Sequence, residues 1–362
     1  VSIHDLMTIY GVKFNPFVLK EYYQENGVWY RNTFKPTKYL MLKGTMVKEP
    51  TVIFRLLKHL VDNEEYRFFY LINWLSYFTK GLIKSQIAII LIGNQGAGKG
   101  ILFDEILTPI FGKSFCFQAN NTSLKSKYKG AMLENRLFFN LDEVSNNKNS
   151  DFKNFLKALI TNTAISEEEK QKNIVDPIEI YGQVLITTNN RIPIEIEEND
   201  RRFTAYTTGD NLIHTNFLGY GSYEDLKDAI KLALNDFVLY LKNYDTDIEL
   251  ANTALSTPEK DIIINASKDK LNEFHHAIVN KDISFLDELE ISHPLLYAEI
   301  RTDFYANRIN RANITKAYNA LYPTKKASSK EILEKLRSLR PYEIFSKQNM
   351  THSGSNHYFN LK

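Results

Sequence analysis

The chain has 362 residues, which suggests two or three domains at roughly 150 residues per domain. Hydrophobic residues make up 43% and charged residues 24%, a composition typical of a globular protein and unlike that of a disordered chain. No stretch approaches the roughly 18 apolar residues of a membrane span, and the single cysteine excludes an internal disulfide and a Cys-based zinc site. We expect a protein of a reducing, cytoplasmic compartment. Because it begins at Val1, without Met and without a signal-peptide pattern, we also expect it to be a piece of a longer polypeptide.

Positive charge is concentrated near the C-terminus. Residues 301–362 contain 12 Lys and Arg against 4 Asp and Glu, a local charge of +8, whereas the whole chain carries +2. A basic segment of this kind is typical of contact with nucleic acid. A solvated basic surface explains the charge equally well, so charge alone leaves both interpretations open.

Residues 1–82 are rich in aromatic side chains and mostly helical in pattern. Apolar residues recur at spacings of three and four between Phe54 and Leu75, as on the buried face of a helix. A short β-like stretch, Val28–Tyr30, precedes them. We expect an N-terminal helical collar domain whose aromatic residues form core.

Residues 83–210 alternate between two patterns. Apolar runs predict strands at Ile87–Ile92, Ser114–Phe117, Leu137–Leu141, Gln183–Thr188 and Phe203–Thr207. Helical periodicity predicts helices at Gly98–Leu107 and Asp151–Ile160. Since the strands are continuously apolar and alternate with helices, we expect an α/β fold with a mainly parallel sheet that is covered on both faces.

The remaining residues are predicted to form two further parts. An amphipathic helix at Ser222–Leu241 opens a helical extension over residues 211–275. Residues 276–362 end in two helices and two short strands around the turn-rich residues 351–356: Ile314–Leu321, Ser328–Leu339, Tyr342–Ser346 and Tyr358–Leu361. Two helices followed by a hairpin with a polar tip indicate a winged-helix-like, basic C-terminal region.

The first chemical motif is Gly-Asn-Gln-Gly-Ala-Gly-Lys-Gly at residues 93–100, between a predicted strand and a predicted helix. This is the G-x-x-x-x-G-K phosphate-binding loop in its required setting. Its glycines let backbone N–H groups face the phosphates, and Lys99 can reach the β and γ phosphates. Gly100 replaces the usual Ser or Thr, so Mg²⁺ needs another protein ligand or a water. The expected nucleotide-binding residues are Gly93, Asn94, Gln95, Gly96, Ala97, Gly98, Lys99, Gly100 and Ile101.

Two carboxylates, Asp142 and Glu143, follow the apolar strand Leu137–Leu141. They are therefore expected at the carboxyl edge of the sheet, where open α/β sheets bind ligands. Asp142 suits a Mg²⁺ shell. Glu143 suits the base that polarises an attacking water, and it is a second candidate metal ligand.

Two further polar positions lie beyond the next strand. Asn189 follows Gln183–Thr188 and could hydrogen-bond the γ-phosphate and the lytic water, although Asn189-Asn190 could simply open a turn. Arg202 directly precedes the strand Phe203–Thr207 and could act as an arginine finger on a neighbouring subunit's nucleotide. The alternative is an Asp–Arg surface pair.

These four motifs, in this order, resemble the superfamily 3 helicases, replication proteins of viruses, phages and plasmids with an AAA+-type core. The resemblance is nearest to the primase-helicase branch of phages and mobile elements, where the phosphate loop often ends in Gly-Lys-Gly. Asn73-Trp74-Leu75 and the stretch from Ala251-Asn252 to Thr257 also look like that branch, so the resemblance covers roughly residues 60–265. It implies ATP hydrolysis with Mg²⁺, a homo-hexameric ring and a fused or associated primase or polymerase module.

The resemblance also implies a β-hairpin that grips DNA in the channel of the ring. Residues 164–180 occupy that position and carry Lys170 and Lys172 at a polar tip. Lysines of this kind can follow backbone phosphates of a single strand without base preference. Three glutamates in the same tip leave open an ordinary charged loop.

The function favoured by these residues is an ATP-dependent replicative DNA helicase, with single-stranded DNA in the channel and duplex DNA as a further candidate ligand of the C-terminal region. Two alternatives remain at this point. One is a phosphotransferase that uses the same loop, and the other is a nucleotide-regulated initiator that loads on an origin without unwinding it.

Overall fold

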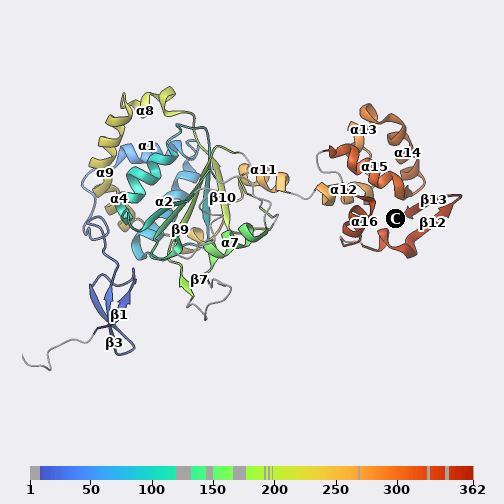
Figure 1. The fold of residues 1–362 in the computed structure, drawn as a ribbon. Coiled ribbons are helices and arrows are strands. Elements are labelled where there is room, and N and C mark those ends of the chain that lie inside the picture. The colour runs from blue at the N-terminus through green and yellow to red at the C-terminus, as the bar shows by residue number, and fades with distance from the viewer. Residues whose placement is uncertain are drawn as a thin grey trace, which may run out of the picture. The chain divides into compact units, whose positions relative to one another are not determined.

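The computed structural model describes residues 9–119, 132–143, 150–165, 177–190, 193–194, 196–197, 199–267, 270–323, 327–338 and 342–361. The chain divides into two compact units, residues 1–267 and residues 268–362 (Figure 1). The boundaries expected near residues 82 and 210 fall inside the first unit, because the elements on either side of them share its cores. Within the described residues, no helix is both long and apolar enough to cross a bilayer.

A five-stranded sheet forms the centre of the first unit. Its strand order is β10-β4-β9-β6-β5, and every neighbouring pair is parallel. The strands are β4 (Ala88–Ile92), β5 (Cys116–Ala119), β6 (Phe138–Asp142), β9 (Gln183–Thr188) and β10 (Phe203–Thr207). Strands β4 and β9 are buried at every position, which explains why β4 is apolar without alternation and why Val184, Leu185 and Ile186 follow one another in β9. The prediction of a parallel α/β fold is confirmed, and all five predicted strands are present.

Helices cover both faces of this sheet (Figure 1). Ile89 and Leu91 of β4 point into one core, which they share with α1 (Thr51–His59), α2 (Glu65–Gly81), α9 (Tyr223–Asn243) and the helical run formed by α3 (Lys99–Ile101), the π-helix η2 (Leu102–Leu107) and α4 (Thr108–Phe111). Ala88 and Ile90 point into the opposite core with α7 (Ser150–Thr161) and α11 (Pro258–Ser267). The alternation of side chains along β4 thus places one helical layer on each face.

The N-terminal segment is not entirely helical. A three-stranded sheet of order β1-β3-β2 precedes α1, with β1 (Ile9–Lys13), β2 (Tyr22–Glu25) and β3 (Val28–Asn32). The predicted β-like stretch Val28–Tyr30 lies in β3. Helices α1 and α2 pack into the same core as the central sheet, so residues 1–82 do not form the separate helical collar that we expected. Helical periodicity identified the two helices, but it could not show that their apolar faces are buried against the sheet.

The family resemblance also included Asn73-Trp74-Leu75 and the stretch from Ala251 to Thr257. In the structure, these two stretches connect α2 and residues 247–257 to each other and to the sheet. Asn73 Nδ2 donates to the Asp247 carbonyl at 2.8 Å, and the Asp247 N–H donates back to Asn73 Oδ1 at 2.8 Å, just before α10 (Ile248–Ala251). Trp74 Nε1 donates to the Ile87 carbonyl at 3.0 Å. Thr257 Oγ1 donates to the Ala205 carbonyl in β10 at 2.7 Å. These residues therefore support the sheet, and none of them lines the cavity of about 630 Å³ described below.

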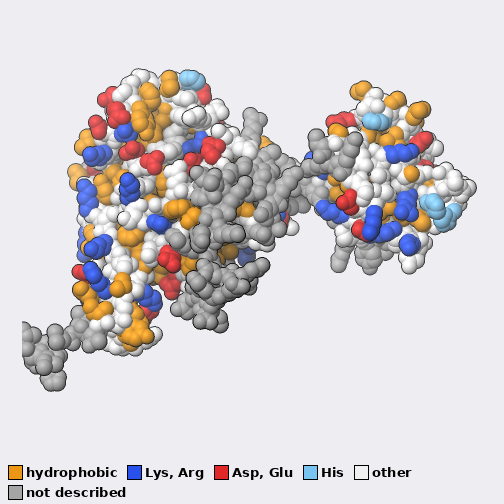
Figure 2. Space-filling view, viewed as in Figure 1, with side chains coloured by type: hydrophobic (Ala, Val, Ile, Leu, Met, Phe, Trp, Pro, Cys, Tyr) orange, Lys and Arg blue, Asp and Glu red, His pale blue; other side chains and the backbone are white. Residues whose placement is uncertain are grey.

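The C-terminal unit is mainly helical. It contains α12 (Lys270–Val279), η4 (Ser284–Leu286), α13 (Asp287–Ser292), α14 (Pro294–Tyr305), α15 (Arg311–Leu321), α16 (Ser329–Ser338), η6 (Tyr342–Phe345) and η7 (Lys347–Asn349). A small antiparallel sheet of order β11-β13-β12 completes it, with β11 (Arg308–Asn310), β12 (Met350–Ser353) and β13 (Asn356–Asn360). The two predicted helices are present as α15 and α16. Figure 2 shows several Lys and Arg side chains close together on the visible face of this unit.

One strand of the expected C-terminal hairpin was assigned wrongly. Residues Tyr342–Phe345 form a 3₁₀ helix, and β12 supplies the strand that pairs with β13. Ile344 and Phe345 are buried in the core of this unit, and Arg337 Nε donates to the Phe345 carbonyl at 2.8 Å. A short apolar run is compatible with either a helical turn or a strand, and here the core contacts select the helical turn. The helix–helix–hairpin order is retained, with a turn at residues 354–355.

Candidate nucleotide-binding site

The phosphate loop lies between β4 and the helical run that begins with α3, as its sequence predicts. Gly96 and Gly98 have φ angles of +86° and +94°, which L side chains rarely adopt. A Cβ on Gly98 would also lie 2.8 Å from a methyl group of Leu56. Lys99 Nζ lies inside the loop and donates to the carbonyls of Gly93 at 2.5 Å and Asn94 at 2.9 Å. The loop is thus a preformed turn with its ammonium group in place.

A second segment, residues 208–212, supports this loop from outside. Asn211 Nδ2 donates to the Gln95 carbonyl at 3.0 Å, and the Leu212 N–H donates to the Gly96 carbonyl at 3.0 Å. Thr208 is so close that a Cβ on Gly93 would lie 1.8 Å from its Oγ1. The sequence alone did not identify this segment, because its contacts depend on the chain returning to the loop after β10.

Asp142 lies at the carboxyl end of β6, and neighbouring strands hold its carboxylate. Thr187 Oγ1 on β9 donates to Oδ1 at 2.7 Å, and Gln118 Nε2 on β5 donates to Oδ2 at 2.9 Å. Each carboxylate oxygen therefore accepts one hydrogen bond and keeps lone-pair capacity toward the cavity. The contact with Thr187 is possible because β9 lies beside β6 in the sheet.

Glu143 follows Asp142 in a different backbone conformation. Its φ angle is +51°, its N–H donates to the Thr187 carbonyl at 2.9 Å, and its side chain is exposed. A left-handed conformation at a non-glycine residue costs free energy and is found frequently at functional sites. At Glu143 it ends the strand and leaves the carboxylate at the rim of the cavity.

Three of the four predicted motifs meet in one cavity of about 630 Å³. It is lined by residues of the phosphate loop together with Asp142, Glu143 and Asn189. Asn189 also lines an adjoining hollow of about 570 Å³ with Gly93 and Asn94. Burial lowers the pKa of Lys99, whereas the negative charges of Glu143 and Asp142 act in the opposite direction. The structure thus brings together every predicted residue of the phosphate loop and of the two strand ends that follow it.

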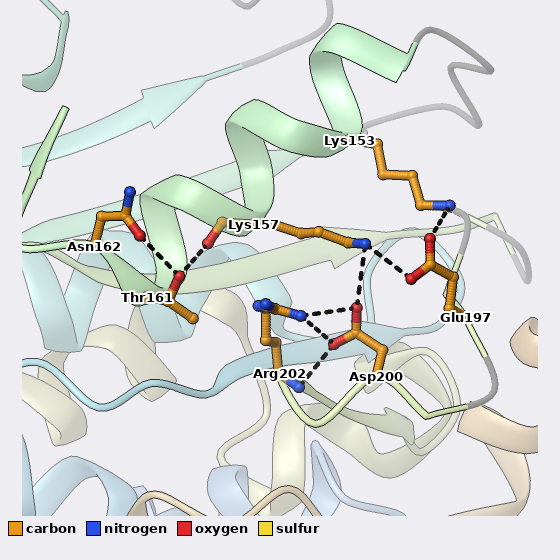
Figure 3. Close-up of polar contacts among 7 residues, drawn as sticks. All are labelled: Lys153, Lys157, Thr161, Asn162, Glu197, Asp200 and Arg202. Carbon is orange, nitrogen blue, oxygen red and sulfur yellow. Dashed lines mark hydrogen bonds and ion pairs between the residues drawn. The ribbon is translucent and has the colours of Figure 1, made fainter. Parts of the chain in front are cut away.

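Arg202 does not lie in this cavity. It precedes β10 at the amino edge of the sheet, where the Ala88 N–H donates to its carbonyl at 2.8 Å. Its side chain is paired with Asp200 at 3.4 Å, and Lys157 of α7 lies 4.0 Å from the same carboxylate (Figure 3). The Asp–Arg pair that the sequence left open is therefore present.

The same network extends along α7. Lys153 and Lys157 contact Glu197 at 2.9 and 3.0 Å (Figure 3). Hydrogen bonds from these two lysines lower the pKa of Glu197 to about 2. The segment before β10 is thus tied to α7 by the ion pairs of Lys153 and Lys157, and the Asp200–Arg202 pair within the segment shares the Asp200 carboxylate with Lys157.

The expected DNA-gripping hairpin is described only at its base. Ala164–Ile165 (β7) and Ile178–Glu179 (β8) pair antiparallel, as a hairpin at this position requires. Lys170 and Lys172 lie outside the described residues.

The donor set of the cavity fits a nucleotide-bound Mg²⁺. No group of three or more His, Cys, Asp or Glu within the described ranges could hold a metal ion by itself. Mg²⁺ does not need such a group when it binds with a nucleotide, because one or two carboxylates, substrate phosphates and waters complete its shell. Asp142, with lone-pair capacity on both oxygens, is suited to this role.

Gln118, Thr187 and Asn211 support the site but were not identified from the sequence. Thr187 lies in β9, and only Asn189, the residue that follows this strand, was selected from the sequence as a candidate site residue. The one signal in the sequence was that two hydroxyl residues, Thr187 and Thr188, end this strand directly before Asn189. Gln118 and Asn211 carry no local signal, since their partners are 24 and 116 residues away.

Comparisons with known proteins agree with this architecture. Residues 91–202 match DUF5906, described as a family of unknown function. The chain is 30% identical over 272 residues to the DNA primase-polymerase of Nitratiruptor phage NrS-1, an alignment that covers 74% of this chain and 37% of that protein. The chain therefore spans little more than a third of that relative's length.

Solved structures of one region of that phage protein have the same fold. The apo structure of the NrS-1 C-terminal region, residues 305–718, matches with a TM-score of 0.74 at 24% identity and covers 98% of this chain and 85% of that chain. The A form apo structure of the same region matches with a TM-score of 0.72. The chain is thus related in sequence to the NrS-1 phage primase-polymerase and shares the fold of its C-terminal region, and its residues 91–202 match the DUF5906 family.

Proposed function

We propose that this chain is the ATP-hydrolysing motor of a phage-type replication protein, which translocates on DNA and unwinds it. The observation that carries the proposal is the convergence of the phosphate loop, Asp142, Glu143 and Asn189 on one cavity. The relationship to a phage DNA primase-polymerase supports a role in DNA replication. We also propose that the core is of the AAA+ type.

Each group in the cavity has a defined chemical task. Lys99 neutralises charge on the β and γ phosphates, and the backbone of the loop binds the same phosphates at a helix N-terminus. Glu143 orients and polarises the attacking water, and Asn189 hydrogen-bonds that water and the γ-phosphate. Asp142 holds Mg²⁺, which when bound neutralises charge on the phosphate oxygens.

The position of Arg202 supports a site shared between subunits. Phe203 pairs with Ala88 and Thr207 with Ile92, so Arg202 and Gly93 lie at opposite ends of β4. A strand rises about 3.3 Å per residue, which separates their backbones by about 20 Å. This distance is much longer than an arginine side chain, so Arg202 can serve a nucleotide only in a neighbouring copy of the chain. We therefore propose a ring, with six subunits as the family resemblance implies.

Two surfaces are proposed to contact DNA. The hairpin that starts from β7 and β8 carries Lys170 and Lys172, and we propose that it follows a single strand in the channel of the ring. The basic C-terminal unit is proposed to contact duplex DNA through its helices and its β12–β13 hairpin. A primase or polymerase module in the same polypeptide, as the name of the NrS-1 relative indicates for that protein, would place priming beside unwinding.

One set of assays separates this function from its alternatives. A helicase should hydrolyse ATP faster with single-stranded DNA and should displace a strand from a forked substrate. A phosphotransferase would show no stimulation by DNA, and an initiator would bind DNA without displacing a strand. Native mass measured with and without nucleotide and DNA tests the ring. Hydrolysis without DNA stimulation and without strand displacement would refute the proposed function.

A further inference from the structure

The phosphate loop lacks the hydroxyl that usually helps to bind Mg²⁺, because Gly100 follows Lys99. Gly100 has no side chain, and its surface is exposed to the cavity. If the cavity binds a nucleotide with Mg²⁺, another oxygen can occupy this position. The nearest candidate side chain lies one helical turn further along.

Asp104 lies in the π-helix η2, four residues after Gly100. Side chains of a helix lean toward its N-terminus, so a residue at this spacing extends back over the preceding turn. A Cβ on Gly100 would lie 3.9 Å from Asp104 Oδ2. The carboxylate thus borders the space that a Ser or Thr side chain at position 100 would fill. Such π-helical turns within helices are found frequently at functional sites.

The carboxylate of Asp104 faces the same cavity as Asp142. Both residues line it together with Gly100. Burial and the negative charge of Asp142 raise the pKa of Asp104. Among the described residues, no group donates a hydrogen bond to the Asp104 carboxylate, whereas both oxygens of Asp142 accept one. Asp104 therefore offers carboxylate oxygens to a ligand in the cavity, beside the Asp142 carboxylate that Thr187 and Gln118 already hold in place.

We infer that Asp104 supplies the protein oxygen ligand for the nucleotide-bound Mg²⁺ that Gly100 cannot supply, so that Asp104 and Asp142 hold the ion between them. The inference rests on the proposed nucleotide-binding function. It has a consequence that a hydroxyl ligand does not have, because a carboxylate repels phosphates when no metal is bound. Asp104 should therefore make nucleotide binding more dependent on Mg²⁺.

Nucleotide affinity measured with and without the metal tests this role. A fluorescent, non-hydrolysable ATP analogue is titrated into the full chain in EDTA and at increasing Mg²⁺, and Mn²⁺ binding is followed by electron paramagnetic resonance. Asp104→Ala should keep or improve affinity in EDTA and should weaken apparent metal affinity at least about tenfold, since even supporting residues of metal sites are worth 10–100-fold. Glu105→Ala is the matched control, because Glu105 is the adjacent acidic residue and does not line the cavity.

A second variant restores the usual ligand. Gly100→Ser combined with Asp104→Ala places a hydroxyl where Gly100 leaves space, and it should recover metal affinity. Asp104→Asn, which keeps the shape of the side chain, measures the same loss if the alanine variant does not fold. Unchanged metal dependence in Asp104→Ala or Asp104→Asn, with intact nucleotide binding, would overturn the role of Asp104 and leave the proposed function standing. Absence of nucleotide binding by the unmodified chain would overturn both.

Discussion

Replacement of Arg202 by alanine tests whether the nucleotide site is shared between subunits. The strand register separates Arg202 from Gly93 of its own chain by about 20 Å. Arg202→Ala should therefore leave ATP binding nearly unchanged. If the guanidinium serves the neighbouring nucleotide, the rate of hydrolysis should fall by about 10³–10⁵-fold. That loss corresponds to about 4–7 kcal/mol in the activation barrier.

The same substitution has a separate effect on stability. The side chain of Asp200 is 1% exposed, and without the Arg202 guanidinium its carboxylate keeps the backbone N–H of residue 202 at 2.9 Å and Lys157 at 4.0 Å. An incompletely paired buried group costs about 1–3 kcal/mol, so the melting temperature should also fall. Asp200→Asn is the matched control, because it removes the ion pair and keeps the arginine. It should lower the melting temperature but retain most of the ATPase activity.

Mixing experiments determine whether the arginine acts between subunits. Arg202→Ala subunits added to Lys99→Ala subunits can form an interface with Arg202 from one chain and Lys99 from the other. ATPase measured with single-stranded DNA should then recover in part, although each variant alone is inactive. A mixture that co-assembles and stays inactive would refute action between subunits. Arg202 would then serve only its pair with Asp200, and the exposed Arg201 would be the next candidate.

Three further substitutions test the remaining groups. Lys99→Ala should abolish ATP hydrolysis and weaken nucleotide binding, because it removes the ammonium group inside the loop; substantial residual hydrolysis would count against this site. Glu143→Gln should bind ATP normally and fail to hydrolyse it, since the amide keeps the size and loses the basicity of the carboxylate, and unchanged turnover would mean that the base is another residue. Lys170→Ala with Lys172→Ala should keep basal ATPase and lose strand displacement, and the salt dependence of single-strand binding should fall by about 0.7 in log–log slope per lost contact. Strand displacement at the unmodified rate would remove the hairpin assignment.

Local sequence determined the strands of the core and the phosphate loop. A strand buried on both faces, such as β4, must be apolar at every position, so Ile87–Ile92 was recognisable without any partner. The loop was equally recognisable, because its glycines meet a local requirement for positive φ at Gly96 and Gly98. In both cases the physical cause lies within a few residues of the pattern.

Short apolar segments did not determine their own conformation. Tyr342–Ser346 is compatible with a strand or a helical turn, and burial of Phe345 in the core of the C-terminal unit selected the turn. The N-terminal strands likewise form through pairing among β1, β2 and β3, which local periodicity does not show beyond Val28–Tyr30.

Only the tertiary structure decided how the site is assembled. The order of strands places Thr187 and Gln118 on either side of Asp142, and the return of the chain after β10 brings Asn211 to the phosphate loop. The parallel pairing of β10 with β4 places Arg202 at the edge of the sheet opposite that loop. None of these contacts joins residues close in sequence. They follow from which strands lie side by side, and that choice depends on burying both faces of the whole sheet at once.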